Sequence, residues 1–248
     1  MRGLLLGRRI VVAVLVVVGL ALASLALPGG PIRAFDRAAA VMGIHKTIEQ
    51  RLDEHRESVR IRCEPRYAAA GVPWPPRRLR LVAFKQEKRL EVYATDAGGA
   101  WRRVGEHPIL AASGALGPKL ARGDRQVPEG LYALESLNPN SRFHLALRVG
   151  YPNAEDLERA RVDGRSDLGG DIMIHGGESS VGCLAMGDPV AEELFVAAAS
   201  AGVEAVSIWI APCDLRTRRD VEPPAGAPAW TRELWDALRA ELERLPSR

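Results

Sequence analysis

A histidine and a cysteine eight residues apart, His175 and Cys183, are the residues of this chain best suited to chemistry. They bound a segment rich in glycine and serine. Because the thiolate is the nucleophilic form of cysteine, a neighbouring imidazole that takes the thiol proton activates the residue at neutral pH. Small residues in the segment let a carbonyl group approach backbone N–H groups that can hold a developing oxyanion. The spacing therefore predicts acyl transfer, with Cys183 as nucleophile and His175 as base.

Two interpretations without acyl transfer compete with this one. Cysteine is among the most often buried residue types, so Cys183 taken alone would be a small core side chain. A zinc site built on His175 and Cys183 lacks a third and a fourth ligand at the usual spacing. The sequence therefore predicts no metal at this pair and no cofactor.

The segment from His175 to Met186 reads His-Gly-x-x-x-Ser-x-Gly-Cys-Leu-Ala-Met. It resembles the signature of the L,D-transpeptidase (YkuD-type) catalytic domain, in the murein transpeptidase branch with the short spacing between histidine and cysteine. The resemblance extends over about residues 79–212. Its supporting matches upstream are Gly117-Pro118-Lys119, Gly123-Asp124 and the segments 127–132 and 151–153.

The resemblance implies a β-rich α+β domain with mixed, sandwich-like sheets and a few short helices. Its substrate would be the peptide stem of bacterial peptidoglycan, cut between the third residue and the following D-alanine. Cys183 would form a thioester, His175 would donate and accept the proton, and an amine of a neighbouring stem would complete a cross-link. The N–H groups of Gly182 and Cys183 are the candidates for the oxyanion hole. Ser180 is expected to orient His175, and Gly176 to leave room for the stem.

Two departures from the family pattern bear on the acceptor. Many members have a histidine before the Gly-Cys pair and an arginine two residues after the cysteine, where this chain has Val181 and Ala185. The substrate contacts of that arginine therefore do not carry over. The branch that shares these departures includes hydrolases that free envelope proteins from peptidoglycan. Water is therefore an alternative acceptor, and a wall-attached lipoprotein is a possible partner. A non-catalytic wall-binding module is the third alternative, which retention of both His175 and Cys183 argues against.

The other polar candidates are weaker. Two residues could border a substrate cleft: His144, which lies on an expected strand, and Tyr151, which lies in a matched segment. The alternative for His144 is a histidine with its hydrogen bonds satisfied by the fold, or one at the surface. His45, His55 and His107 have polar neighbours and are expected to be solvated.

The first 30 residues predict export. Arginines at positions 2, 8 and 9 precede an uncharged run over residues 10–27, which fits a secretory signal with a cleavage site near residues 21–23 or a retained membrane anchor. Either alternative places the rest of the chain in the periplasm or cell envelope, with the membrane contacted through this segment. A formal net charge of +3 gives no case for nucleic-acid binding.

Three cysteines leave at least one unpaired within an exported chain. Cys183 is expected to be the free thiol. Cys63 and Cys213 then form either a bridge across the domain or two buried structural thiols.

The remaining chain divides into three predicted parts. Residues 31–76 are expected to form a helical stalk and linker, with the helix over 33–60 and a break beginning at Pro65. Residues 77–214 form the catalytic domain, and residues 215–248 a linker and a peripheral helix over 231–245. Within the catalytic domain, helices are predicted at 154–162 and 188–200, and strands at 78–84, 90–94, 101–104, 131–135, 143–149, 171–175 and 203–210.

Overall fold

The computed structural model describes residues 45–96 and 98–246, and the chain divides into two compact units, Met1–Thr47 and Ile48–Arg248. The predicted signal or anchor over residues 1–30 lies outside the described residues, as does the first part of the helix predicted over 33–60. Within the described part of the chain, no helix combines the length and the apolar character needed to cross a membrane.

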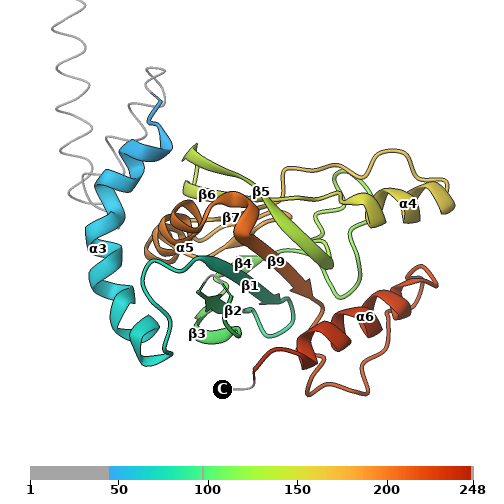
Figure 1. The fold of residues 1–248 in the computed structure, drawn as a ribbon. Coiled ribbons are helices and arrows are strands. Elements are labelled where there is room, and N and C mark those ends of the chain that lie inside the picture. The colour runs from blue at the N-terminus through green and yellow to red at the C-terminus, as the bar shows by residue number, and fades with distance from the viewer. Residues whose placement is uncertain (1–44, 97, 247–248) are drawn as a thin grey trace, which may run out of the picture. The chain divides into compact units, whose positions relative to one another are not determined.

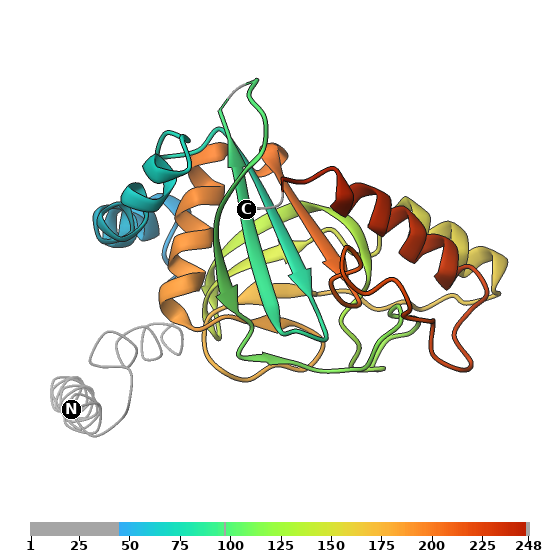
Figure 2. The same ribbon diagram turned by 90° about the horizontal axis from the view of Figure 1, so that it is seen from below.

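The second unit is organised around a nine-stranded sheet with the order β3-β2-β1-β9-β5-β6-β7-β8-β4 (Figures 1 and 2). Pairing is parallel for β1 with β9 and for β7 with β8, and antiparallel for the other neighbours. The strands are β1 Arg78–Phe84, β2 Arg89–Thr95, β3 Arg102–Pro108, β4 Ala111–Ala112, β5 Gly130–Ser141, β6 His144–Val149, β7 Met173–His175, β8 Leu184–Ala185 and β9 Val206–Ala211.

The α+β class with many strands is confirmed, but the expected sandwich of sheets is replaced by one curled sheet. The long strand β5 makes this possible, since its first residues pair with β9 and its later residues with β6. Register shifts between Leu134 and Ser136 and between Asn138 and Ser141 interrupt the β5–β6 ladder. Such bulges increase local twist and bend a strand, so one strand serves both halves.

The sheet separates two cores. Alternate residues of β1 point to opposite faces, as strand geometry requires. Leu79, Leu81 and Ala83 belong to the larger buried cluster, whereas Val82 and Phe84 belong to a second cluster. The predicted hairpin of β1 and β2 is confirmed, and both faces of β1 are covered.

Four α-helices accompany the sheet in the described residues: α3 Ile48–Ala69, α4 Ala154–Val162, α5 Asp188–Ala201 and α6 Thr231–Glu243. The predicted cap of α4 is present, because Asn153 and Asp156 exchange side-chain and backbone hydrogen bonds in a capping box. Helix α5 begins at the predicted Asp188-Pro189 and ends before Gly202. The strand predicted over 203–210 starts with a 3₁₀ turn, Val203–Ala205, that precedes β9.

Helix α3 corrects the prediction that the helix stops at Arg60 and the chain breaks at Pro65. The helix continues to Ala69 with Pro65 inside it. Val59, Cys63 and Tyr67, spaced four residues apart, are fully buried in the larger cluster, where α3 packs along α5 (Figure 1). We infer that this burial outweighs the cost of about 3 kcal/mol that an interior proline imposes on a helix.

Helix α6 is integrated into the second core, which corrects the prediction of a peripheral helix. Trp235, Leu238 and Leu242 are buried there together with Val82 and Phe84 of β1. The indole Nε1 of Trp235 also donates to Glu129 Oε2 at 2.7 Å. The division of the chain into parts at residues 77 and 215 stays a prediction.

The three cysteines are free thiols, so of the two alternatives for Cys63 and Cys213 the structure has two buried thiols and no bridge. Cys63 lies in the larger cluster and Cys213 in the second one, on the other side of the sheet. Packing each thiol into a separate core keeps the two sulfur atoms apart.

We expect Trp235→Ala to lower the free energy of unfolding by about 3–5 kcal/mol, because it removes a large core side chain and a donor to a buried carboxylate. Arg244→Ala, at the end of the same helix, is the control, since the Arg244 side chain is 72% exposed and its loss should change stability by less than about 0.5 kcal/mol. Urea unfolding followed by circular dichroism measures both. Equal unfolding midpoints for the two variants would contradict the integration of α6 into the core.

Candidate active site

His175 and Cys183 come from two paired strands. His175 ends β7, and Cys183 directly precedes β8. The parallel register places Ile174 opposite Leu184, and both of these side chains are fully buried in the larger cluster. The β7–β8 pair therefore anchors the segment 174–184 at both ends and keeps the imidazole and the thiol in the same neighbourhood.

Within the described residues the thiol and the imidazole form no hydrogen bond with each other. The Cys183 Sγ atom lies 3.6 Å from the carbonyl oxygen of Asp171, in the segment that leads into β7. The hydrogen bond between a catalytic nucleophile and its base is often long or absent before substrate binds, so the lack of a direct bond is compatible with the predicted pair.

The His175 ring is held by its own backbone and by an aromatic neighbour. Its Nδ1 atom lies 2.6 Å from the carbonyl oxygen of Gly176. A carbonyl only accepts, so Nδ1 carries the proton and Nε2 is left as the basic nitrogen. The ring of Phe143 stacks on the imidazole at a centroid distance of 4.6 Å and an interplanar angle of 27°.

These contacts correct the role predicted for Ser180, whose hydroxyl accepts from the N–H of Cys183 at 3.0 Å and makes no hydrogen bond to His175. Phe143 was not predicted. It lies in the β5–β6 turn, far from the catalytic segment in sequence, and the residue is 42% exposed, so no local pattern marks it.

Gly176 has a packing role instead of the predicted one of leaving room for substrate. A Cβ atom added there would lie 2.6 Å from Asp188 Oδ1 and 2.7 Å from the carbonyl oxygen of Phe143. The same Asp188 oxygen accepts from the N–H of Gly177 at 2.7 Å. A glycine is therefore required because α5 and the β5–β6 turn approach the chain closely at this point.

The predicted oxyanion donors both have acceptors in this structure. The N–H of Gly182 donates to Ser113 Oγ at 2.7 Å, and that hydroxyl donates to the carbonyl oxygen of Arg125 at 2.7 Å. The N–H of Cys183 donates to Ser180 Oγ. Binding an oxyanion at these N–H groups therefore requires the two hydroxyls to be displaced. Ser113 was not predicted, because it is 69 residues before Gly182 in sequence.

Burial keeps both reactive groups neutral. It lowers the pKa of His175 below the usual 6.5, against the opposing effect of the Gly176 carbonyl. It raises the pKa of the Cys183 thiol, and the nearby Asp171 carboxylate adds to this effect. Both shifts favour the uncharged forms at neutral pH, so a thiolate at Cys183 needs a base to take the thiol proton.

Neither of the two candidate cleft residues points its side chain to the catalytic pair. The Nε2 atom of His144 lies 3.1 Å from Glu192 Oε1 on α5. Tyr151 is buried, and its hydroxyl donates to the carbonyl oxygens of Lys119 and Leu168 at 3.3 and 3.4 Å. Both side chains are satisfied by the fold, which corrects their predicted role.

Two of the histidines expected to be solvated are also packed against α5. His55 is 9% exposed, and its Nδ1 atom lies 3.7 Å from Glu192 Oε1. His107 Nε2 lies 3.2 Å from Glu193 Oε1, which also binds Arg66. The sequence signal for these contacts is the consecutive pair Glu192 and Glu193 in a mainly apolar helix, because buried carboxylates need basic partners. His45 is exposed, as predicted.

A cavity of about 330 Å³ borders the catalytic segment through Ser113. Its other lining residues are Lys85, Gln86, Lys88, Ala112 and the segment 114–116. Lys85 Nζ already donates to the carbonyl oxygens of Gly117 and Val127 and to Glu129. Lys88 is the other cation of the lining, and its side chain is exposed.

No protein-family model matches the chain. Over 114 residues the chain is 38% identical to the protein named "Putative L,D-transpeptidase YafK" of Escherichia coli K12, which covers 45% of this chain and 44% of YafK. The chain carries an L,D-transpeptidase-type domain. The resemblance to L,D-transpeptidases is thereby confirmed at the level of the domain, while the chain matches less than half the length of this relative.

Solved structures with a similar chain course include the helical cell shape determining protein Pgp2 of Campylobacter jejuni, at 20% identity and a TM-score of 0.44, over 68% of this chain and 70% of Pgp2. L,D-transpeptidase 1 of Mycobacterium tuberculosis gives 17% identity and a TM-score of 0.32, over 54% of this chain and 62% of that chain. The assignment of the L,D-transpeptidase-type domain rests on the sequence match with YafK.

The neutral resting pair predicts how Cys183 responds to pH. We expect its alkylation rate by iodoacetamide to keep rising beyond pH 9.0, the ordinary thiol pKa, because the protonated form is favoured by burial. Mass spectrometry of the labelled chain measures the rate, and Cys183→Ala shows the background from the buried Cys63 and Cys213. A rate that levels off below pH 7 would instead reveal a thiolate–imidazolium pair.

Proposed function

We propose that this chain is a cysteine-dependent L,D-transpeptidase that acts on the peptide stems of peptidoglycan in cell-wall remodelling. The observation that carries the proposal is the setting of His175. Its Nδ1–H group donates to the Gly176 carbonyl, so Nε2 is left as a base at the end of β7, the strand paired with β8, which Cys183 directly precedes. The match with YafK supports the substrate class.

In the proposed first step, Cys183 Sγ attacks the carbonyl carbon of the third stem residue while His175 Nε2 takes the thiol proton. The carbonyl electrons move to the oxygen and give a tetrahedral oxyanion. When it collapses, the C–N bond breaks and His175 returns its proton to the amine of the departing D-alanine. The product is a thioester on Cys183.

In the second step, an amine of a neighbouring stem attacks the thioester and gives its proton to His175. The C–S bond breaks, the amide cross-link forms, and the proton returns to Cys183. The Gly182 and Cys183 N–H groups would stabilise both oxyanions once Ser113 and Ser180 give way to the substrate. A stem carboxylate is the proposed occupant of the cavity beside Ser113, facing Lys88.

A hydrolase is the second candidate, favoured by the residues around the nucleophile. The position where many family members have an arginine is Ala185, which is fully buried, and Val181 beside the Gly-Cys pair is 70% exposed and apolar. Neither offers a charged contact to an acceptor stem, so water could resolve the same thioester and release stems or a wall-attached lipoprotein. Nucleophile and base would be unchanged. Both candidates place the site in the periplasm or envelope, reached through the N-terminal segment.

The test follows the full chain and its products by mass spectrometry after incubation with tetrapeptide muropeptides. Wild type should carry a stem-sized adduct on Cys183, which Cys183→Ala should lose together with turnover. We expect His175→Gln to lower turnover by about 10²–10⁴-fold, because it removes the base and keeps a side chain of similar size. Ser179→Ala, an exposed position in the same segment, is the matched control and should stay near wild type.

The products separate the candidates. Cross-linked dimers with the adduct support transpeptidation, whereas shortened stems without dimers favour hydrolysis. Unchanged turnover in Cys183→Ala would contradict both the transpeptidase and the hydrolase. Wall binding without any adduct or product would leave the non-catalytic module as the better account.

A further inference from the structure

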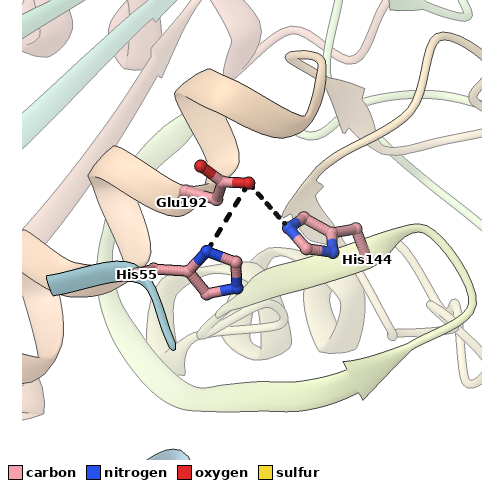
Figure 3. Close-up of side chains that lie close together, drawn as sticks. All are labelled: His55, His144 and Glu192. Atoms are coloured by element: carbon pink, nitrogen blue, oxygen red, sulfur yellow. Dashed lines mark hydrogen bonds and ion pairs between the residues drawn. The ribbon is translucent and has the colours of Figure 1, made fainter. Parts of the chain in front are cut away.

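A second group of chemistry-bearing side chains lies outside the catalytic pair (Figure 3). It consists of His55 on α3, His144 at the start of β6 and Glu192 on α5, which we call the His–Glu cluster. Glu192 Oε1 lies 3.1 Å from His144 Nε2 and 3.7 Å from His55 Nδ1. All three ligand atoms lie within 4.8 Å of one another. Three elements far apart in sequence thus converge on one point.

We propose that the His–Glu cluster is a binding site for a divalent transition-metal ion, with zinc as the best fit. Zinc binds two imidazole nitrogens and one carboxylate oxygen at about 2.0–2.2 Å in a tetrahedral arrangement. This geometry places neighbouring ligand atoms about 3.3–3.5 Å apart, between the two distances measured to Glu192 Oε1. The two imidazole nitrogens lie within 4.8 Å of each other, so binding would require them to move closer, and a water molecule would complete the fourth position.

The surroundings orient the ligands as outer residues do in metal sites. Glu192 uses its other oxygen, Oε2, to bind Arg62 at 3.1 Å, which turns Oε1 toward the two histidines. The Nε2 atom of His55 is buried without a hydrogen bond and lies 3.9 Å from Glu54 Oε2. A ring that ligates through Nδ1 and faces a carboxylate with Nε2–H matches the carboxylate–histidine–metal arrangement.

Acidic and basic side chains both surround the cluster in the described part of the chain. Glu54 and Glu192 contribute two negative charges, while Arg62 and Arg51 contribute two positive ones. Arg51 points away to the carbonyl oxygen of Pro139 and to Glu54. The ion therefore gains its affinity from direct coordination in a largely buried site, which favours the softer imidazole-binding metals over calcium or magnesium.

Occupancy would clamp α3 and the β5–β6 turn to α5. His144 follows Phe143, whose ring stacks on His175, so the ion fixes the residue next to this aromatic support. The proposed metal site is distinct from the catalytic pair and does not require that pair to be active.

The test measures zinc binding by the full chain in the Cys183→Ala background, which removes the reactive thiol as a competing ligand. Equilibrium dialysis with elemental analysis gives the stoichiometry, and cobalt substitution gives the absorption spectrum of a tetrahedral site. We expect one zinc per chain, lost or weakened at least tenfold by His144→Ala and by the nearly isosteric Glu192→Gln. His107→Ala is the matched control, since His107 faces the adjacent Glu193 but has no second histidine beside it.

The readouts separate this proposal from the proposed function, because the Cys183→Ala protein is inactive in turnover and still expected to bind zinc. Circular dichroism of each variant checks that it is folded. If His144→Ala does not fold, Glu192→Gln still tests the metal site. Zinc binding in every variant with equal affinity, or no stoichiometric binding in any, would overturn the metal site.

Discussion

The buried carboxylate of Glu129 constrains the rest of the fold. Its side chain is fully enclosed and accepts from Lys85 Nζ at 3.0 Å, from the N–H of Gly117 at 2.8 Å and from Trp235 Nε1 at 2.7 Å. An ionised carboxylate without such donors costs several kcal/mol to bury. The end of β1, the segment before β5 and helix α6 must therefore assemble together. The same segment carries Ser113 to the N–H of Gly182, so a core interaction sets the position of a residue beside the nucleophile.

Burial also sets the chemistry of the site. The fold removes His175 and Cys183 partly from water, which disfavours the charged forms of both. In the proposed mechanism, proton transfer and attack are then coupled, since Cys183 becomes charged only as it reacts. Without substrate, the hydroxyls of Ser113 and Ser180 accept from the N–H groups of Gly182 and Cys183, so these partly buried donors are not left unpaired.

The parts of the structure that local chemistry determines could be predicted from the sequence. The β1–β2 hairpin follows from alternation, and the start of α4 follows from the Asn153 cap. Residue type and spacing also predict His175 and Cys183 as the catalytic pair, and this pair stays a prediction. Apart from the role of Ser180, which its hydrogen bond to the nearby Cys183 N–H corrects, the main misses depend on contacts made across long stretches of chain. Pro65 stays helical because of packing on α5, and Phe143 reaches His175 only once the β5–β6 turn is folded. No periodicity or motif encodes such contacts.

The position of β9 has a consequence for how the chain reaches its native state. This strand lies between β1 and β5, and its Ser207 meets Arg80 of β1 across 127 residues. The hairpin of β1 and β2 can form early, but one edge of β1 stays unpaired until residues near 211 are available. Pairing over such a separation must overcome a large loop-closure entropy, so folding is expected to be slow. During that interval an open strand edge is exposed to other chains, and rapid association with a holding chaperone would protect it.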